Sequence, residues 1–157
     1  MKHFTLLFSF LLLITTSLSA QVEPVGKDKV AIGGYDVVAY FNTGKATKGN
    51  ASISSTNNGI LYYFASAENK DAFVKNPDAY LPQYDGYCAL AVGAQNKKVS
   101  INPEAFKITD GKLYLFFNGE LPLSRKKFNS IEPWNRDEDA LIKKADANWP
   151  SLKAKKK

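Results

Sequence analysis

The chain has 157 residues, of which 45% are hydrophobic, and a formal net charge of +6, so it can bury the core of one domain. Its one histidine, His3, lies near the N-terminus, and its one cysteine is Cys88. Beyond residue 3 the sequence therefore excludes Ser-His-Asp and Cys-His catalytic groups and every metal site that needs histidine, and Cys88 cannot form a disulfide within the chain.

Residues 1–20 have the layout of a secretory signal peptide. Lys2 supplies a positive start, residues 4–14 form an apolar run, and residues 17–20 are small apart from Leu18. The apolar run is too short to cross a bilayer stably, and an uncleaved membrane anchor is the alternative interpretation. We therefore predict an exported protein, periplasmic or secreted, with a mature chain of 137 residues (157 − 20) and no transmembrane segment.

The mature chain is predicted to begin with a polar lead-in followed by a tight turn. Residues 21–30 are expected to be flexible, and residues 31–150 are expected to form a single domain. Gly33 and Gly34 permit a tight or left-handed turn. Asp36 can then cap a helical turn over residues 37–41.

A hairpin and a helix are predicted next. Residues 52–64 read as two strands, because the run 57–59 (Asn-Asn-Gly) is a strong turn signal. Ser66 is a good cap for a helix over residues 67–75. Pro77 begins a further helical turn, which ends before Pro82.

The second half predicts another hairpin and a C-terminal helix. Residues 107–117 form the hairpin, with Asp110-Gly111 at its tip. Residues 123–128 are interpreted as a helical turn. A final helix is expected from Glu132 through Ala145, and Trp149-Pro150 is expected to close the fold.

Two stretches of the chain are echoed later in the sequence. Residues 59–64 resemble residues 111–116, and residues 76–80 resemble residues 102–106. Any two hairpins and any two proline-started helices look alike, so we favour that explanation over duplication. The fold class predicted is α+β, with small antiparallel hairpins packed against short helices and a C-terminal helix.

The positive charge is concentrated at the C-terminus. Residues 151–157 form a lysine-rich tail, whereas residues 21–150 hold 16 basic and 15 acidic residues. A tail of this kind is usually a solvated end, and contact with anionic lipid or envelope polymer is the alternative. The sequence therefore predicts no nucleic-acid partner.

Cys88 is the residue with the most distinctive reactivity. It precedes a run, residues 89–92, that is typical of a helix or a buried strand. In the first turn of a helix, the dipole would favour the thiolate. The alternative is a small buried side chain, which is the usual state of a free cysteine.

The residues around Cys88 are the candidates for ligand binding. Tyr84 and Tyr87 flank Asp85-Gly86, an arrangement that suits a pocket wall because tyrosine buries its ring and keeps a polar hydroxyl. Tyr35 and Asp36 follow the first glycine pair and are assigned to the same site. Turn and cap roles explain both aspartates without any chemistry.

The run 61–66 (Leu-Tyr-Tyr-Phe-Ala-Ser), then Phe73 and the run 76–82 (Asn-Pro-Asp-Ala-Tyr-Leu-Pro), resembles the YHS domain family. The flanking stretches 33–41, 86–89 and 145–150 are similar to an exported single-domain branch of that family. The resemblance implies a YHS-like core and metal binding, with copper as the candidate ion. The usual family cysteines, however, are Ala65 and Asn69 in this chain, and the histidine of the family name is Tyr63.

The resemblance also implies that Cys88 is reactive, because some members of that branch are selenoproteins. The expected function is a small-ligand, metal-binding or redox-accessory module centred on Cys88, with a small ligand or an envelope protein as its partner. Two alternatives stay open: a thiol oxidoreductase that uses Cys88 as its nucleophile, and a structural interaction domain. A non-enzymatic role is preferred.

Overall fold

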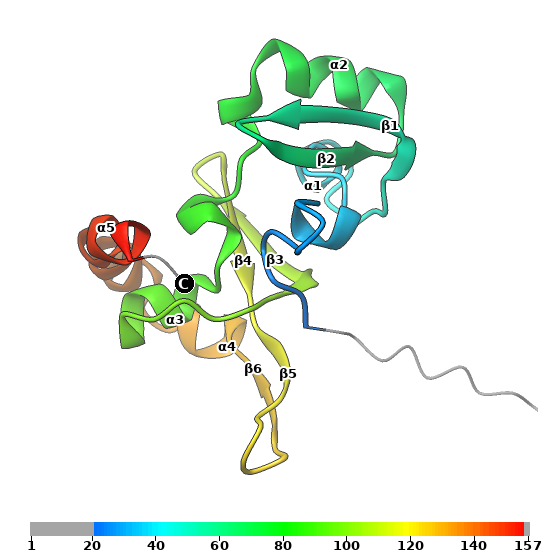
Figure 1. Cartoon of the computed structure of the whole chain (residues 1–157). Helices are drawn as coiled ribbons and strands as arrows, with labels where there is room; N and C mark the ends of the chain where they lie inside the picture. The colour runs from blue at the N-terminus through cyan, green and yellow to red at the C-terminus, as the bar shows by residue number, and fades with distance from the viewer. Residues whose placement is uncertain (1–20, 156–157) are drawn as a thin grey trace, which may run out of the picture.

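The computed structural model describes residues 21–155, so the predicted signal peptide lies outside the described residues. Within them, the strands pair as three antiparallel hairpins, β1–β2, β3–β4 and β5–β6, and a long helix ends the fold. The predicted α+β class is therefore confirmed (Figure 1). In chain order the helices and strands are α1 (Ala39–Asn42), β1 (Asn50–Asn57), β2 (Ile60–Phe64), α2 (Ala67–Lys75), α3 (Ala89–Gln95), β3 (Asn102–Thr109), β4 (Lys112–Phe116), β5 (Asn118–Glu120), β6 (Lys127–Asn129), α4 (Ile131–Trp134) and α5 (Glu138–Ala154).

The first hairpin packs against α2. Its two-residue turn places Asn58 and Gly59 in the left-handed region, with φ of 50° and 77°, as a twisted hairpin requires. Ser66 caps α2 by accepting a hydrogen bond from the Asn69 amide at 3.2 Å. Phe73 of α2 is buried against this hairpin, so the predicted hairpin and the predicted helix form one unit.

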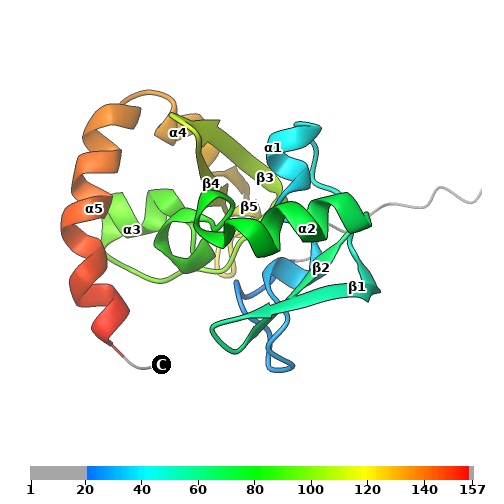
Figure 2. The ribbon, with the colours of Figure 1, turned by 90° about the horizontal axis from the view of Figure 1, so that it is seen from above.

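The second hairpin packs against α3 and α5, which lie beside each other (Figure 2). A Cβ added to Gly93 of α3 would stand 2.7 Å from the Leu141 carbonyl oxygen of α5, so these helices approach closely because residue 93 lacks a side chain. Trp134 is fully buried beside Tyr114 and Phe116 of β4. The core is thus continuous from the hairpin to the C-terminal helices.

The two hairpins have the same pairing register. Asn50 pairs with Phe64 in the first hairpin and Asn102 pairs with Phe116 in the second; 102 minus 50 and 116 minus 64 are both 52. Every other pair recurs at the same offset, and each long strand has a register irregularity after its first residue. The parallel bridge of Val30 with Leu61 recurs between Pro82 and Leu113. We call residues 30–65 the first repeat and residues 82–117 the second repeat.

Several local predictions are wrong. Residues 102–106, expected to echo a proline-started helix, belong to strand β3, and residues 127–128 belong to β6 rather than to a helical turn. The final helix is broken, because α4 ends at Trp134 before α5 begins at Glu138. The chain also continues past Pro150 as helix to Ala154, so the lysine-rich tail begins inside α5.

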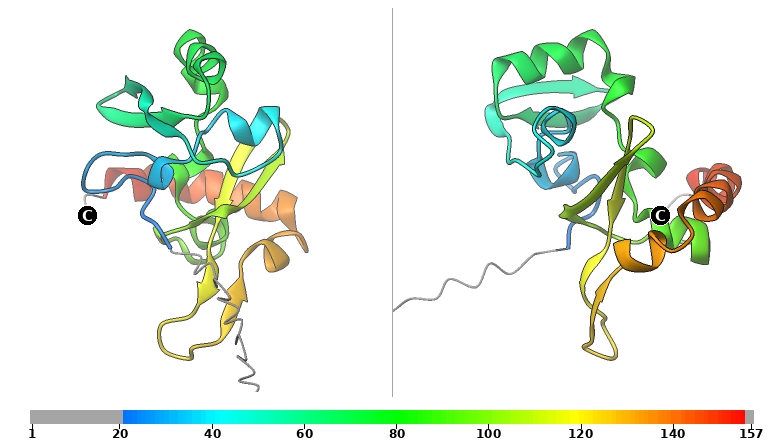
Figure 3. Two further views of the ribbon diagram at one scale, coloured as in Figure 1. Left: turned by 90° about the vertical axis from the view of Figure 1, so that its right-hand side faces the viewer. Right: turned by 180° about the vertical axis from the view of Figure 1, so that it is seen from behind.

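The lead-in is packed against the domain rather than flexible. Val22 bridges to Ile101 and Val25 bridges to Ala31, and Pro24 is buried. At the other extreme, the β5–β6 hairpin projects from the body (Figure 3), with the side chain of Leu123 fully exposed. No helix among residues 21–155 is both long and apolar enough to cross a membrane.

Candidate functional site

Cys88 stands immediately before α3 and is 2% exposed. Its Sγ accepts a hydrogen bond from the Phe117 amide at 3.3 Å and lies 3.4 Å from the Ser130 Oγ. The Ser130 hydroxyl donates to the Phe117 carbonyl oxygen at 2.8 Å. Because a hydroxyl carries one proton, the thiol is the donor toward Ser130, and the three groups form a closed set of hydrogen bonds.

The residues before Cys88 form a turn with an unusual backbone. Tyr84, Asp85 and Gly86 are consecutive left-handed residues, with φ of 56°, 49° and 83°. A Cβ at Gly86 would stand 2.9 Å from Ile32 Cδ1 and 3.1 Å from Pro24 Cβ, so only glycine fits there. Left-handed tyrosine and aspartate each raise the energy of the backbone, and such strain is found preferentially at functional sites.

Tyr84 ties this turn to α5. Its hydroxyl donates to the Asp146 Oδ1 at 2.9 Å, and its ring lies 5.9 Å from the Trp149 ring. Burial, and then the hydrogen bond to Asp146, raise the pKa of Tyr84 far above its ordinary value. Tyr84 therefore keeps its proton, and its contacts with Asp146 and Trp149 fix the turn to α5.

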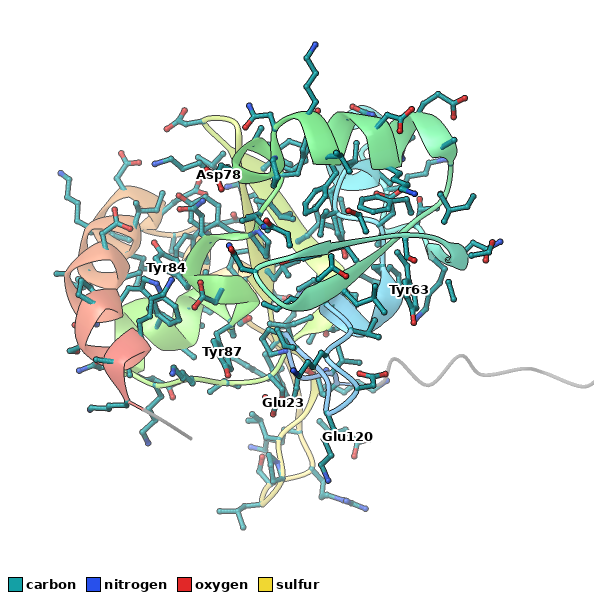
Figure 4. All side chains as sticks on the ribbon, turned by 45° about the horizontal axis from the view of Figure 1, so that its top comes forward. Glu23, Tyr63, Asp78, Tyr84, Tyr87 and Glu120 are labelled. Carbon is teal, nitrogen blue, oxygen red and sulfur yellow. The ribbon has the colours of Figure 1, made fainter. Side chains whose placement is uncertain are left out.

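Asp85 and Tyr87 face a cavity of about 530 Å³. Asp85 pairs with Lys153 at 3.1 Å, and Lys98 lies over the Tyr87 ring at 5.6 Å. Figure 4 shows Tyr84 beside α5, with Asp78 and Tyr87 at opposite ends of this region. The first repeat lines the cavity with Ala31, Ile32, Asn57, Asn58, Ile60 and Tyr62. The second repeat lines it with Pro82, Asp85, Tyr87 and Lys98, and the remaining lining residues are Pro24, Val25, Asp78, Leu81 and Lys153.

This cavity lies between the two repeats, and we call it the inter-repeat cavity. A smaller hollow of about 300 Å³ lies on the other side of the turn, against Tyr84, Asp146 and Trp149. Asp85 borders both spaces. A further hollow of about 610 Å³ lies over Gly33 and Lys48, but it is lined by none of the predicted site residues.

The structure does not bring all the predicted site residues together. Asp85 and Tyr87 line the inter-repeat cavity, and Tyr84 lies behind the turn that bears them. Cys88 and Tyr35 are absent from the lining of all three spaces among the described residues. Tyr35 instead lies under the Lys48 ammonium, 4.3 Å from its ring centroid.

Asp36 is a structural residue. It is fully buried, and its Oδ1 accepts the amides of Val38 at 2.8 Å and Ala39 at 3.2 Å. Asp36 thus bonds the amides at the predicted position, but the helix itself begins later than predicted, at Ala39. Its Oδ2 accepts the Ala65 amide at 2.8 Å and the Asn69 side-chain amide at 2.7 Å. With four donors on two oxygens, Asp36 is committed to the fold.

These contacts bear on the predicted metal site. Ala65 and Asn69, at the positions where the YHS resemblance implies cysteines, meet around the Asp36 carboxylate. An amide nitrogen that donates a hydrogen bond stands where a thiolate would be, so this donor set does not suit a soft metal ion. Across residues 21–155, no three His, Cys, Asp or Glu side chains are grouped as a metal site would need.

Sequence reasoning missed much of the cavity lining. Asp78 falls in the predicted helical turn after Pro77, Asn58 in the predicted hairpin turn and Lys153 in the predicted tail, and none of these patterns indicates a binding site. Lys98 has no sequence pattern that points to the cavity. These residues are distant in the sequence and meet through the packing of the repeats. Comparisons of the chain with protein-family models, with curated proteins and with solved structures found no match. The resemblance to the YHS family therefore rests on the residues quoted for it.

Proposed function

We propose that this chain is an exported, non-catalytic binding domain of the YHS type that takes a small zwitterionic molecule with an apolar part into the inter-repeat cavity. Its volume of about 530 Å³ is in the range of small-molecule sites. Ile32, Ile60 and Leu81 supply apolar surface for the body of such a ligand.

The charges of the lining support the zwitterionic character. The cavity is bordered by two carboxylates, Asp78 and Asp85, and two ammonium groups, Lys98 and Lys153. A ligand with one charge of each sign could pair with both kinds of group. A ligand with a single charge would be attracted by the groups of opposite charge and repelled by the groups of the same charge.

The observation that carries the proposal is the backbone of Asp85. At the equivalent position the first repeat has Gly33, which adopts φ 58° without a side-chain penalty. The second repeat keeps an aspartate at φ 49°, with its carboxylate on the cavity wall. Aspartate is less stable than glycine in the left-handed conformation. Its presence at this position is expected if the carboxylate takes part in binding.

Binding is tested with three probes that share one ring: phenylalanine, 2-phenylethylamine and phenylacetate. We expect phenylalanine to shift the amide NMR signals of Asp85, Tyr87 and Lys98, with a Kd near about 1 mM or tighter, and the singly charged probes to bind more weakly. Asp85→Gly should weaken binding about tenfold, whereas Glu120→Gln, on the projecting hairpin, should not change it. Absence of shifts for all three probes would contradict the proposal.

The same substitution separates a binding role from a structural one. Asp85→Gly relieves a left-handed backbone and removes an exposed ion pair with Lys153, whose contribution is at most about 1 kcal/mol. We therefore expect an unfolding free energy that is unchanged or higher by up to about 1 kcal/mol, measured by urea denaturation. A loss of more than that would mean that Asp85 serves the fold.

The redox and metal roles predicted for Cys88 gain no support from this geometry. Its sulfur is buried and hydrogen-bonded, and it lies off the lining of the inter-repeat cavity. The thiol oxidoreductase alternative needs an accessible thiolate. The proposed binding site is therefore placed on the turn before Cys88 rather than on its sulfur.

A further inference from the structure

The two repeats share every left-handed position. In the first repeat these positions are 32, 33, 34, 44, 58 and 59, and in the second they are 84, 85, 86, 96, 110 and 111. Each pair is separated by 52 positions, the offset that also relates the strand registers. Only some of these residues are glycine, so the shared conformation belongs to the backbone path and not to composition.

The sequences agree at the same offset without a gap. Over the 36 positions of each repeat, nine residues are identical. They include the buried pairs Tyr62 with Tyr114 and Phe64 with Phe116. The other identical pairs are Gly34 with Gly86, Tyr35 with Tyr87, Ala39 with Ala91, Lys45 with Lys97, Asn50 with Asn102, Gly59 with Gly111 and Leu61 with Leu113.

At this offset Cys88 corresponds to Asp36, and their contacts correspond as well. The Asp36 amide donates to the Thr47 carbonyl at 2.9 Å and the Cys88 amide donates to the Val99 carbonyl at 3.1 Å. The Asp36 side chain accepts the Ala65 amide, and the Cys88 side chain accepts the Phe117 amide.

A second polar side chain contacts each of the two residues, although these two contacts are not related by the offset of 52. Asn69 donates to Asp36 from the element after the first hairpin. Ser130, which follows the third hairpin, β5–β6, lies beside Cys88 and accepts a hydrogen bond from its thiol. Both side chains thus tie the end of a left-handed turn to the end of a hairpin.

We infer that the domain arose by duplication of one unit, and that Cys88 is a positioning residue that occupies the place of a hydrogen-bonded carboxylate. The polar groups around its sulfur, which we call the cage, are groups that could donate hydrogen bonds to a carboxylate. The Phe117 amide already donates to the sulfur. The Ser130 hydroxyl accepts from the thiol and would donate to a carboxylate by turning its proton away from the Phe117 carbonyl. The amides of Leu90 and Ala91 correspond to those of Val38 and Ala39 on Asp36, and first-turn amides lack intrahelical partners.

This inference does not rest on ligand binding, and it makes an unusual prediction. An aspartate at a position that is 2% exposed ordinarily prevents folding, because a buried charge without partners is very unfavourable. Cys88→Asp should nevertheless fold, because the cage can supply the hydrogen bonds. The matched control is Ala91→Asp, also buried in this segment at 4% exposure. Ala91 contributes its backbone amide to the cage, whereas its methyl side chain takes no part in the hydrogen bonds.

The experiment compares thermal unfolding of wild type, Cys88→Asp, Cys88→Ala and Ala91→Asp by circular dichroism. We expect Cys88→Asp to lower Tm by no more than Cys88→Ala does, about 3–8 °C, and Ala91→Asp to lower it by at least about twice as much or to abolish folding. Loss of folding in Cys88→Asp, or a Tm decrease equal to that of Ala91→Asp, would overturn the inference.

A second measurement uses the thiol itself. In the folded protein Cys88 should react with a disulfide reagent such as DTNB at least about a hundredfold more slowly than in urea, because reaction requires opening of the closed hydrogen bonds. Reaction in the folded state at the rate of the unfolded chain would show an accessible thiol, and it would also contradict the positioning role.

Discussion

At the scale of single residues, the buried carboxylate of Asp36 holds together parts of the chain that are distant in sequence. It accepts hydrogen bonds from the start of α1, from the end of β2 and from α2. Removal of such an acceptor leaves several buried donors without partners. The resulting decrease in the free energy of unfolding exceeds the contribution of one typical hydrogen bond, because each donor left without a partner is also buried away from water.

Asp36→Ala should therefore lower the free energy of unfolding by at least about 3 kcal/mol. Urea denaturation followed by circular dichroism measures the change. Asp71→Ala, at an exposed position of α2 in the same half of the chain, is the control and should shift the value by less than about 0.5 kcal/mol. Equal effects of the two substitutions would show that the Asp36 hydrogen bonds contribute little.

At the scale of elements, Glu138 fixes the start of α5 to β3 and α4. Its carboxylate accepts hydrogen bonds from the Lys107 ammonium at 2.6 Å, the Thr109 hydroxyl at 2.7 Å and the Trp134 indole at 2.9 Å. Burial alone raises the pKa of Glu138, but these three donors together lower it below its ordinary value. The break between α4 and α5 is thus bridged by one side chain.

Glu138→Gln should destabilise the protein by about 1–2 kcal/mol at neutral pH, because the charge-assisted bonds are replaced by weaker ones. Because the pKa of Glu138 is lower in the folded state than its ordinary value of 4.5, its ionised carboxylate stabilises the fold above that pH. This stabilisation is lost as the pH falls below 4.5 and through the folded pKa. The difference between wild type and variant in urea melts should therefore shrink on acidification. Glu132→Gln, at an exposed position of α4, should show neither effect.

At the scale of the whole molecule, buried tyrosines make the fold sensitive to alkali. Burial raises the pKa of Tyr62 to about 12 and raises that of Tyr40 and Tyr84 further, with the Asp146 carboxylate adding to the effect at Tyr84. In the unfolded chain these phenols titrate near 10.0. A raised folded pKa stabilises the fold below that value, and the contribution is lost as the pH rises above it.

We expect Tm to be nearly constant between neutral pH and about 9 and to fall steeply above about 10, with tyrosinate absorbance appearing together with unfolding. Tyr84→Phe should have a lower Tm at neutral pH, because it loses the bond to Asp146, and a shallower decline in alkali. Tyrosinate signal from all eight tyrosines before unfolding would contradict the burial of these hydroxyls.

Several features of this protein could be predicted from the sequence because they are local. Asn58-Gly59 and Asp110-Gly111 set the two hairpins through the backbone conformations that these pairs favour, and Ser66 set the start of α2 by a contact three residues away. The sequence also identified the turn at residues 84–87, because tyrosines around Asp-Gly are typical of a pocket wall.

The tertiary structure decided the rest, because it depends on which distant groups meet. The burial of Cys88, the hydrogen bonds of Asp36 and the lysines of the inter-repeat cavity follow from the packing of one repeat on the other. Part of the repeat is visible in the sequence, as the likeness of residues 59–64 to residues 111–116. The sequence favours ordinary hairpin similarity over duplication, because matching backbone conformations elsewhere are occupied by different residues, such as Gly33 and Asp85. A left-handed residue other than glycine gives no reliable signal in sequence, whereas its φ angle identifies it at once in the structure.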